Sequence, residues 1–375
     1  MKNPLQKTLI LFLLSALCLT CCACGQPGSR DSREAVTLWY AEGSELAAML
    51  ETLAEEYNAS LGSSELLPVS LRAFPDEDSL AAGFNTARPD LLLCSHSRAF
   101  SIYATGVIRD MGEALDGTGP AYPDYLKSYS PCIGNGYFPI GFETQLLYVH
   151  DNAANAADWN LMRLLEYTAE YGLEEGLPFM TTDSFSALLY DMLLSWGTEL
   201  HGIRQLDITN LRYLSAYNLL AEAAFTGGLI SSEVPAEVLV QSGYVSCAAI
   251  NSASLIGADM ESCTVFPLPR LQTSQVYLAQ AEGLAVTARD GRDLQSIAGF
   301  LSWLSQGGRM SVAALGAGLV PAVDFENVEI HGILQTVLLE LANEGEAHFP
   351  MPESDFYQNR ALLEAELRAA MELLN

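Results

Sequence analysis

The stretch Pro89-Asp90-Leu91-Leu92-Leu93-Cys94 contains a short strand that is apolar at every position from Leu91 to Cys94. A strand without polar alternation is typical of a sheet that is covered on both faces, as parallel sheets are. A helix is expected directly after it, ending near Gly106. A strand followed by a helix favours a βαβ unit, and therefore an α/β protein.

The same alternation begins upstream of this strand. Ala35–Tyr40 is expected to be a strand, and Ser44–Ser60 a helix that its first residue caps and whose apolar residues share one face. A second strand is expected near Leu67–Ala73. Asp78 is then expected to cap a helix over Ser79–Asn85.

Strands and helices continue to alternate along the rest of the chain, without an internal repeat. The expected strands are Tyr137–His150, Tyr244–Ile250, Cys263–Phe266 and Val276–Thr287. The expected helices are Asp158–Tyr171, Phe185–Trp196 with Asp183 as its cap, Leu206–Phe225, Asp293–Ser305, Arg309–Leu315, Val328–Asn343 and one from Pro352 onward.

The first residues have the order of a secretion signal. Lys2 and Lys7 make a basic start, Leu9–Leu19 is uncharged and apolar, and the run ends in Cys21-Cys22-Ala23-Cys24-Gly25. This ending resembles a bacterial lipobox, which implies a signal peptide over residues 1–23 and lipidation of Cys24. Cys21 or Cys22 as the lipidated residue, and a plain secretory leader, are the alternatives. Residues 24–34 are polar and are expected to form a flexible tether.

The composition limits the partners. The chain has 375 residues, half of them apolar, which is enough for the cores of two ordinary domains. Its 46 acidic residues outnumber the 18 basic ones, so its net charge is −28. Proteins that bind nucleic acid need the opposite sign of charge, and nucleic acid is therefore not expected as a partner.

Four cysteines lie beyond the leader, at Cys94, Cys132, Cys247 and Cys263. Their wide spacing contains no Cys-x-x-Cys pair, which argues against a zinc site. An exported protein can form disulfides, and Cys247 with Cys263 is the first pair to consider. Two buried free thiols are the alternative.

Several motifs occur in the order known from one family. They are Trp39-Tyr40 at the end of the first strand, Arg88–Arg98, Phe138–Tyr148, Cys247–Ser252, Gly283–Val286, Ala298–Leu304 and Gly318–Pro321. Together they cover most of the mature chain. In this order and approximate spacing, the chain resembles the bacterial extracellular solute-binding proteins of the maltose-binding type.

The resemblance implies an α/β, two-lobed periplasmic-binding-protein fold (type II), with each lobe an open sheet flanked by helices and with hinge crossovers. Lobe 1 would comprise residues 35–141 plus 283–318, and lobe 2 residues 142–282 plus 319–375. It also implies a monomer, lipid-anchored on the outer face of the cytoplasmic membrane. This monomer would capture a small polar, carbohydrate-like solute for an ABC-type membrane permease, with no enzyme activity, cofactor or metal.

Ligands of open α/β sheets bind outside the carboxyl ends of the strands, so residues at these ends are candidate contacts. The candidates lie within Tyr40–Ser44, Ser95–Arg98, Phe142–Glu143 and Asn251–Ser254. Those singled out are Tyr40, Glu42, Ser95, His96, Arg98, Phe142, Glu143, Asn251, Ser252 and, by a looser match, Tyr357. The resemblance implies that Glu143 and Arg98 bind the solute between the rings of Tyr40 and Tyr357. A hinge ion pair is the alternative for Glu143, a surface charge for Arg98, and contacts to backbone groups for His96.

The chain departs from the maltose type at aromatic positions. Cys94 and Ser254 stand at or near positions where that type has stacking tryptophans, and Ser97 stands where it has an aspartate. Sugar stacking needs large flat faces, so a long malto-oligosaccharide is not expected as the ligand.

Two other functions remain open at this point. One is a solute sensor or adhesion lipoprotein, which a permease or ATPase gene beside this one would argue against. The other is an exported hydrolase. The chain has no Gly-x-Ser-x-Gly elbow and no His-Glu-x-x-His motif, and no carboxylate pair has a spacing that singles it out.

Replacing Cys24 with Ser is expected to release the protein from membranes, because the lipidated thiol would be lost and no acyl chain would hold the chain there. Membrane fractionation and labelling with a fatty-acid analogue measure this. Unchanged labelling of the Cys24→Ser variant would assign the anchor to another cysteine.

Overall fold

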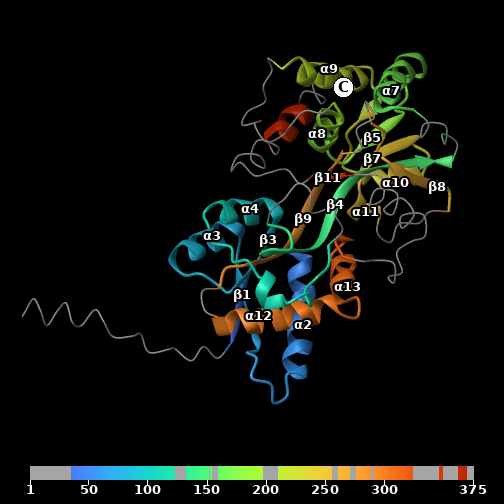
Figure 1. Ribbon diagram of the computed structural model, residues 1–375. Helices are drawn as coiled ribbons and strands as arrows, with labels where there is room; N and C mark the ends of the chain where they lie inside the picture. The colour runs from blue at the N-terminus through green and yellow to red at the C-terminus, as the bar shows by residue number, and fades with distance from the viewer. Residues whose placement is uncertain are drawn as a thin grey trace, which may run out of the picture. The chain divides into compact units, whose positions relative to one another are not determined.

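The structure is a computed structural model that describes residues 35–122, 132–151, 153, 159–196, 210–255, 261–270, 276–288, 291–323, 346–348 and 362–369 (Figure 1). The leader, the tether with Cys24, the predicted helix Val328–Asn343 and Tyr357 lie outside these residues. Of the helix predicted from Pro352 onward, residues 362–369 are described, and they are helical.

Three parallel strands begin the fold: β1 (Val36–Ala41), β2 (Val69–Phe74) and β3 (Leu91–Ser95), with β1 between the other two. Asp90 explains why the Pro-Asp pair precedes β3. Its buried carboxylate accepts hydrogen bonds from the Thr37 backbone N–H at 2.8 Å and the Thr37 hydroxyl at 2.9 Å. A buried carboxylate is costly unless it is hydrogen-bonded, so this residue holds β3 in register beside β1.

The helices that follow these strands cover both faces of the sheet. α2 (Glu45–Ser60) connects β1 to β2, α3 (Glu77–Thr86) connects β2 to β3, and α4 (His96–Ala104) follows β3. The chain moves across the sheet in opposite directions in its first two crossovers, and right-handed crossovers then place their helices on opposite faces. Figure 1 shows α3 and α4 on one side of these strands and α2 on the other.

Two long strands connect the first group of strands with a second group. β4 (Tyr137–His150) pairs antiparallel with β9 (Val276–Val286) and, over two residues, with β10 (Val320–Pro321). After Thr144 the partners of β4 change to β7 and β8. Within the described residues, eleven strands form one hydrogen-bonded system along the path β2-β1-β3-β9-β4-β7-β5-β6.

The second group has the following strands and helices: α7 (Leu161–Glu175), β5 (Met180–Thr182), α8 (Phe185–Ser195), α9 (Leu211–Phe225), β6 (Leu229–Ile230), α10 (Ala236–Gln241), β7 (Cys247–Asn251), α11 (Ser252–Leu255) and β8 (Cys263–Pro267). The remaining ones are α5 (Gly112–Leu115), α12 (Gly291–Ser305), α13 (Arg309–Gly316) and β11 (Glu346–His348). In the residues described, no helix is both long and apolar enough to cross a membrane.

Alternate residues of β4 belong to two hydrophobic cores. Leu146 and Tyr148 join the core that includes α10 and the whole first group of strands. Leu147 and Val149 join the core formed with α7, α8 and α9. Successive side chains of a strand point to opposite faces, so helices on both sides bury the second group of strands, as they do the first.

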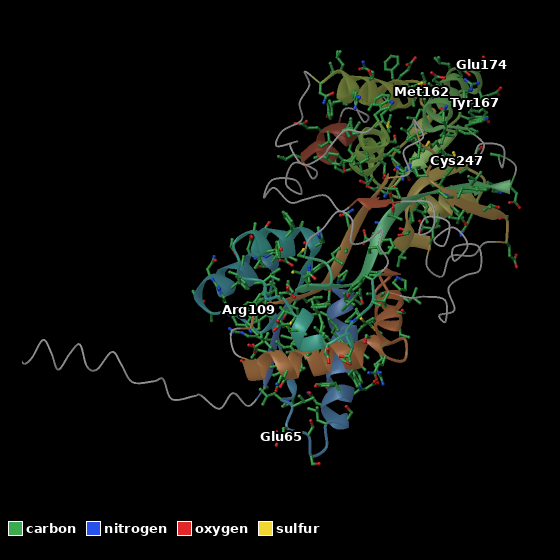
Figure 2. The ribbon with its side chains drawn as sticks, viewed as in Figure 1. Glu65, Arg109, Met162, Tyr167, Glu174 and Cys247 are labelled. Carbon is green, nitrogen blue, oxygen red and sulfur yellow. The ribbon has the colours of Figure 1, made fainter. Side chains whose placement is uncertain are left out.

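Cys247 and Cys263 are buried free thiols, so the disulfide considered above does not form. β7 and β8 pair with the same residues of β4, which therefore lies between them. Two strand spacings separate the two cysteines by roughly 9–10 Å, beyond the reach of a disulfide. They also belong to different cores, Cys263 to the first and Cys247 to the second. Cys247 is labelled in Figure 2.

The close approach of β9 to β4 requires a glycine at position 283. A Cβ built on Gly283 would lie 2.3 Å from the Phe138 carbonyl oxygen and 2.5 Å from the Pro139 Cα. Both are backbone atoms at the bulge of this strand pair, and they cannot move without shifting the strands.

We expect Gly283→Ala to lower the free energy of unfolding by about 1–3 kcal/mol, the usual cost of overpacking. Urea denaturation measures it. Gly299→Ala in α12 is the control, because its nearest contact is the end of the Leu66 side chain and alanine favours helix. Equal stability of the two variants would contradict the assigned constraint.

Candidate functional site

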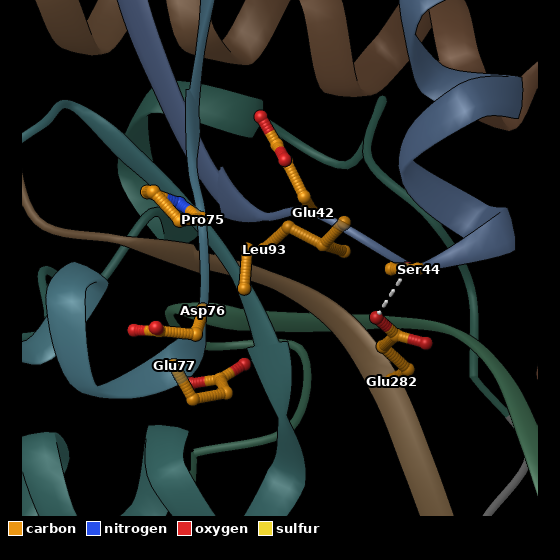
Figure 3. Close-up of a pocket in the computed structure, with 8 residues that line it drawn as sticks. Glu42, Ser44, Pro75, Asp76, Glu77, Leu93 and Glu282 are labelled. Carbon is orange, nitrogen blue, oxygen red and sulfur yellow. Dashed lines mark hydrogen bonds between the residues drawn. The ribbon is translucent and has the colours of Figure 1, made fainter.

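A cavity of about 290 Å³ lies at the carboxyl ends of the first two strands. It is lined by Ala41, Glu42, Ser44, Pro75, Asp76, Glu77, Leu93 and Glu282. These residues come from the end of β1 and the loop after it, the loop after β2 with the start of α3, strand β3 and the crossover strand β9 (Figure 3). Its volume is at the small end of ligand pockets, which span roughly 300–1,000 Å³.

The loop after β1 is fixed by local hydrogen bonds. The Glu42 backbone N–H donates to the Phe74 carbonyl at 2.7 Å and joins this loop to the end of β2. Gly43 adopts a φ of 91°, a left-handed conformation that glycine accommodates without strain. Ser44 then caps α2, as expected, by accepting from the Ala47 N–H at 3.2 Å.

Asp76 begins the second loop of the cavity. It caps α3 by accepting from the Ser79 backbone N–H at 2.7 Å, and hydrogen bonding from Ser79 lowers the pKa of its carboxyl. The expected cap, Asp78, instead lies in the first turn of this helix. The prediction was therefore wrong by two residues, and the corrected cap brings Asp76 and Glu77 to the cavity.

Glu282 reaches the cavity from the middle of β9. It lies opposite Ser95, at the carboxyl end of β3, because β9 runs antiparallel to β3. The Ser44 hydroxyl donates to its Oε1 at 2.9 Å, which favours the ionised carboxylate. Burial and, more weakly, the charges of Glu77 and Glu143 act in the opposite direction and raise its pKa overall.

A second polar cluster lies at the start of the second group of strands. The Asn251 side-chain amide donates to Glu143 Oε2 at 2.5 Å, and the Asn251 backbone N–H donates to Asp183 Oδ2 at 2.6 Å. Asp183 was expected to cap α8, but Ser184 is the cap. Within the described residues Glu143 forms no ion pair with an arginine, and its charge acts on Glu282.

The predicted site residues in the first group of strands have different environments. Glu42 lines the cavity. Tyr40 is buried and does not line it, because its hydroxyl donates to Glu51 of α2, and this hydrogen bond, with burial, raises the pKa of Tyr40 to about 12. Arg98 forms an ion pair with Glu77 at 3.6 Å and so lies next to the cavity.

Ser95 and His96 have structural contacts at the end of β3. Ser95 caps α4, and its hydroxyl lies 3.0 Å from that of Ser97. His96 is buried, with its ring 5.7 Å from that of Tyr137 and its Nε2 3.9 Å from the Cys132 sulfur. Among the described residues, His96 therefore has neighbours in the protein interior and does not line the cavity.

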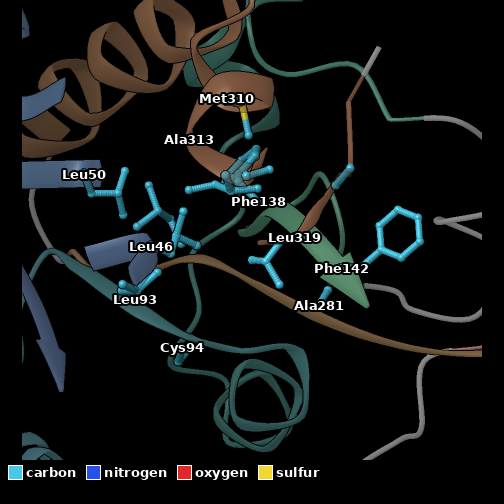
Figure 4. Close-up of a cluster of buried hydrophobic side chains, with 14 of the residues drawn as sticks. Leu46, Leu50, Leu93, Cys94, Phe138, Phe142, Ala281, Met310, Ala313 and Leu319 are labelled. Atoms are coloured by element: carbon cyan, nitrogen blue, oxygen red, sulfur yellow. The ribbon is translucent and has the colours of Figure 1, made fainter. Parts of the chain in front are cut away.

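Phe142 and Ser252 also belong to the interior. Phe142 is packed in the first core, beside Leu319 and Ala281 in Figure 4. Ser252 is fully buried, and its hydroxyl accepts from the Thr144 backbone N–H at 3.1 Å. Phe142 lies on the face of β4 that packs into the core, and Ser252 directly follows β7 in the interior. Neither side chain lines the cavity.

Ser44 belongs to the expected range Tyr40–Ser44, and it lines the cavity. Asp76, Glu77 and Glu282 also line it but were not among the predicted site residues. A signal existed for Asp76 and Glu77, since they come soon after the end of β2. Glu282 had no such signal, because it lies inside a strand. Across the described residues, no group of three or more His, Cys, Asp or Glu side chains is placed to hold a metal ion.

No family model matches this chain, and no curated protein matches it. Solved structures do resemble it. UgpB from Mycobacterium tuberculosis, solved with glycerophosphocholine, has a TM-score of 0.65 and 16% identity over 91% of this chain and 96% of that one. The cyclic alpha-maltosyl-1,6-maltose binding protein from Arthrobacter globiformis has a TM-score of 0.62 and 15% identity over 90% and 96%.

An ABC transporter solute-binding protein from Agrobacterium radiobacter, in complex with ribitol, has a TM-score of 0.61 and 16% identity over 91% of this chain and 97% of that one. At these identities the likeness concerns the fold. It confirms the predicted two-lobed periplasmic-binding-protein fold, with sheets flanked by helices and joined by the β4 and β9 crossovers.

Glu282→Gln is expected to stabilise the protein at neutral pH. A folded-state pKa above the unfolded one means that stability is greatest with the carboxyl protonated and is lost as the pH rises through the folded pKa. Glutamine removes the charge and keeps an oxygen that can accept from Ser44. Thermal unfolding should therefore show a higher Tm at about pH 7 and a smaller difference at about pH 4, near the ordinary glutamate pKa.

Glu65→Gln, in the exposed loop that leaves α2 (Figure 2), is the matched control and should change the Tm little. A lower Tm of Glu282→Gln at neutral pH would show that the ionised carboxylate is a net stabilising group.

Proposed function

We propose that this chain is an extracytoplasmic solute-binding protein that captures a small polar, carbohydrate-like solute for an ABC-type importer and has no catalytic activity. The observation that carries the proposal is the cavity at the carboxyl ends of β1 and β2, with Glu282 contributed by the crossover strand β9. In open α/β sheets, ligands bind at these ends of the strands.

The structural neighbours support the proposal. Solved structures of this fold include complexes with ribitol and with glycerophosphocholine, which are both small and polar. A cavity of about 290 Å³ suits a molecule of that size better than a long oligosaccharide. The absence of aromatic residues among its eight lining residues agrees with the loss of stacking positions in the sequence.

The crossover strands supply a means of coupling binding to a change of conformation. Lobe 1 would comprise residues 35–141 plus 283–318, and lobe 2 residues 142–282 plus 319–375, so β4 and β9 would be the hinge. Glu282 of β9 contacts Ser44 in the first group of strands, while Glu143 of β4 contacts Asn251 in the second. A solute held by residues of both groups would stabilise the closed form through contacts made to both lobes.

The lipid anchor at Cys24 and the permease are the remaining parts of this proposal. An acyl anchor followed by the polar residues 24–34 would keep the two lobes beside the permease.

The proposal is tested by adding sugars, polyols, amines, organic acids and choline esters to the purified full chain. A solute present at 100 times its Kd should raise the free energy of unfolding by about 2.7 kcal/mol. Small-angle scattering should then show a smaller radius of gyration with that solute, and chromatography should recover it unchanged. Turnover of the bound solute, or the absence of any binding across the classes, would contradict the proposed function.

A further inference from the structure

The ionisable groups that line the cavity all have the same sign. Glu42, Asp76, Glu77 and Glu282 are carboxylates that come from three separate parts of the chain (Figure 3). None of the eight lining residues is a lysine, arginine or histidine. A concave surface with charges of one sign concentrates the field and attracts ligands of the opposite charge.

Only part of this negative charge is balanced by described neighbours. Arg98 forms an ion pair with Glu77 at 3.6 Å, and the Ser44 hydroxyl donates to Glu282 at 2.9 Å. Burial raises the pKa of Glu282 most, the hydrogen bond from Ser44 lowers it, and the like charges of Glu77 and Glu143 raise it further. A cation in the cavity would relieve this repulsion, whereas a neutral solute would leave it in place.

The chemistry of the lining also distinguishes between kinds of cation. Quaternary ammonium groups have no N–H and are recognised by aromatic faces, but no ring lines this cavity. Primary and secondary ammonium groups carry N–H donors, which form strong charge-assisted hydrogen bonds with carboxylates. Leu93, Pro75 and Ala41 supply an apolar wall beside these carboxylates.

We infer that the solute of this site carries a primary or secondary ammonium group, which binds between Glu282 and the carboxylates that follow β1 and β2. The inference rests on the proposed function, because it names the ligand class of the same cavity. An amino sugar or an amino polyol of monosaccharide size fits both the volume and the charge. Glu282 is the residue that selects the amine, since it alone among the four carboxylates lies on a crossover strand.

The experiment compares matched pairs of probes by calorimetric titration of the purified full chain. The pairs are glucosamine with glucose, N-methylglucamine with sorbitol, and putrescine with butane-1,4-diol, and choline is the quaternary control. In at least one pair, we expect the amine to bind at least tenfold more tightly than its neutral partner and than choline. Its binding should weaken with added salt, as an interaction between charges does.

Two variants make the result specific to the site. Glu282→Gln should weaken the binding of the amine at least tenfold while it raises the Tm, so lost binding could not be attributed to lost folding. Glu65→Gln carries the same change of net charge on an exposed loop and should bind as the natural protein does.

Tight binding of glucose, sorbitol or another neutral solute, with no response to any amine, would overturn the amine inference and leave the proposed function in place. Equal affinity for the two members of every pair that binds, or unchanged amine affinity in Glu282→Gln, would overturn it as well. No binding of any solute class would count against both the inference and the proposed function.

Discussion

The antiparallel pairing of β4 with β9 is the constraint on which the fold and the site both depend. One face of this pair is apolar and buried, where Phe142 lies opposite Ala281. The next residues along point to the other face, where Glu143 lies opposite Gln280 and Glu282 follows two residues later. Packing of the apolar face therefore fixes the direction of the two glutamates. The close approach that Gly283 permits keeps this alternation in register.

The fixed position of Glu282 has an electrostatic cost. Burial and like charges raise its pKa, and the hydrogen bond from Ser44 offsets only part of that effect. Without the cationic ligand that we propose, a cavity that holds charges of one sign together is less stable, and such a trade of stability for function is common. Since Ser44 is also the cap of α2, the site and the first helix share one hydroxyl. A change at Ser44 would thus affect both.

Much of the fold could be predicted from sequence patterns, and the errors have a local cause. β4 was expected over Tyr137–His150 and has these bounds, because fourteen residues without a helical period leave little choice. The caps of α3 and α8 were each misplaced, by two residues and by one. Asp76-Glu77-Asp78 and Asp183-Ser184 each offer adjacent residues that can cap, and the choice between them depends on the preceding backbone, which the sequence does not display.

The site was less predictable, because the rule applied to it was incomplete. Residues that follow parallel strands were expected at the ligand, and among them Glu42 and Ser44 line the cavity. The rule does not cover an antiparallel strand such as β9, which runs past the carboxyl ends of the parallel strands and places a residue from its middle, Glu282, in the cavity. The pairing of Ser95 with Glu282 requires the register of β9, which depends on the fold as a whole. The register also decides which residues of β4 point to which face of the sheet. It directs Phe142 into the core and Glu143 away from it. The lining of this cavity is therefore determined by strand register, and only the part that follows the parallel strands can be predicted from local sequence.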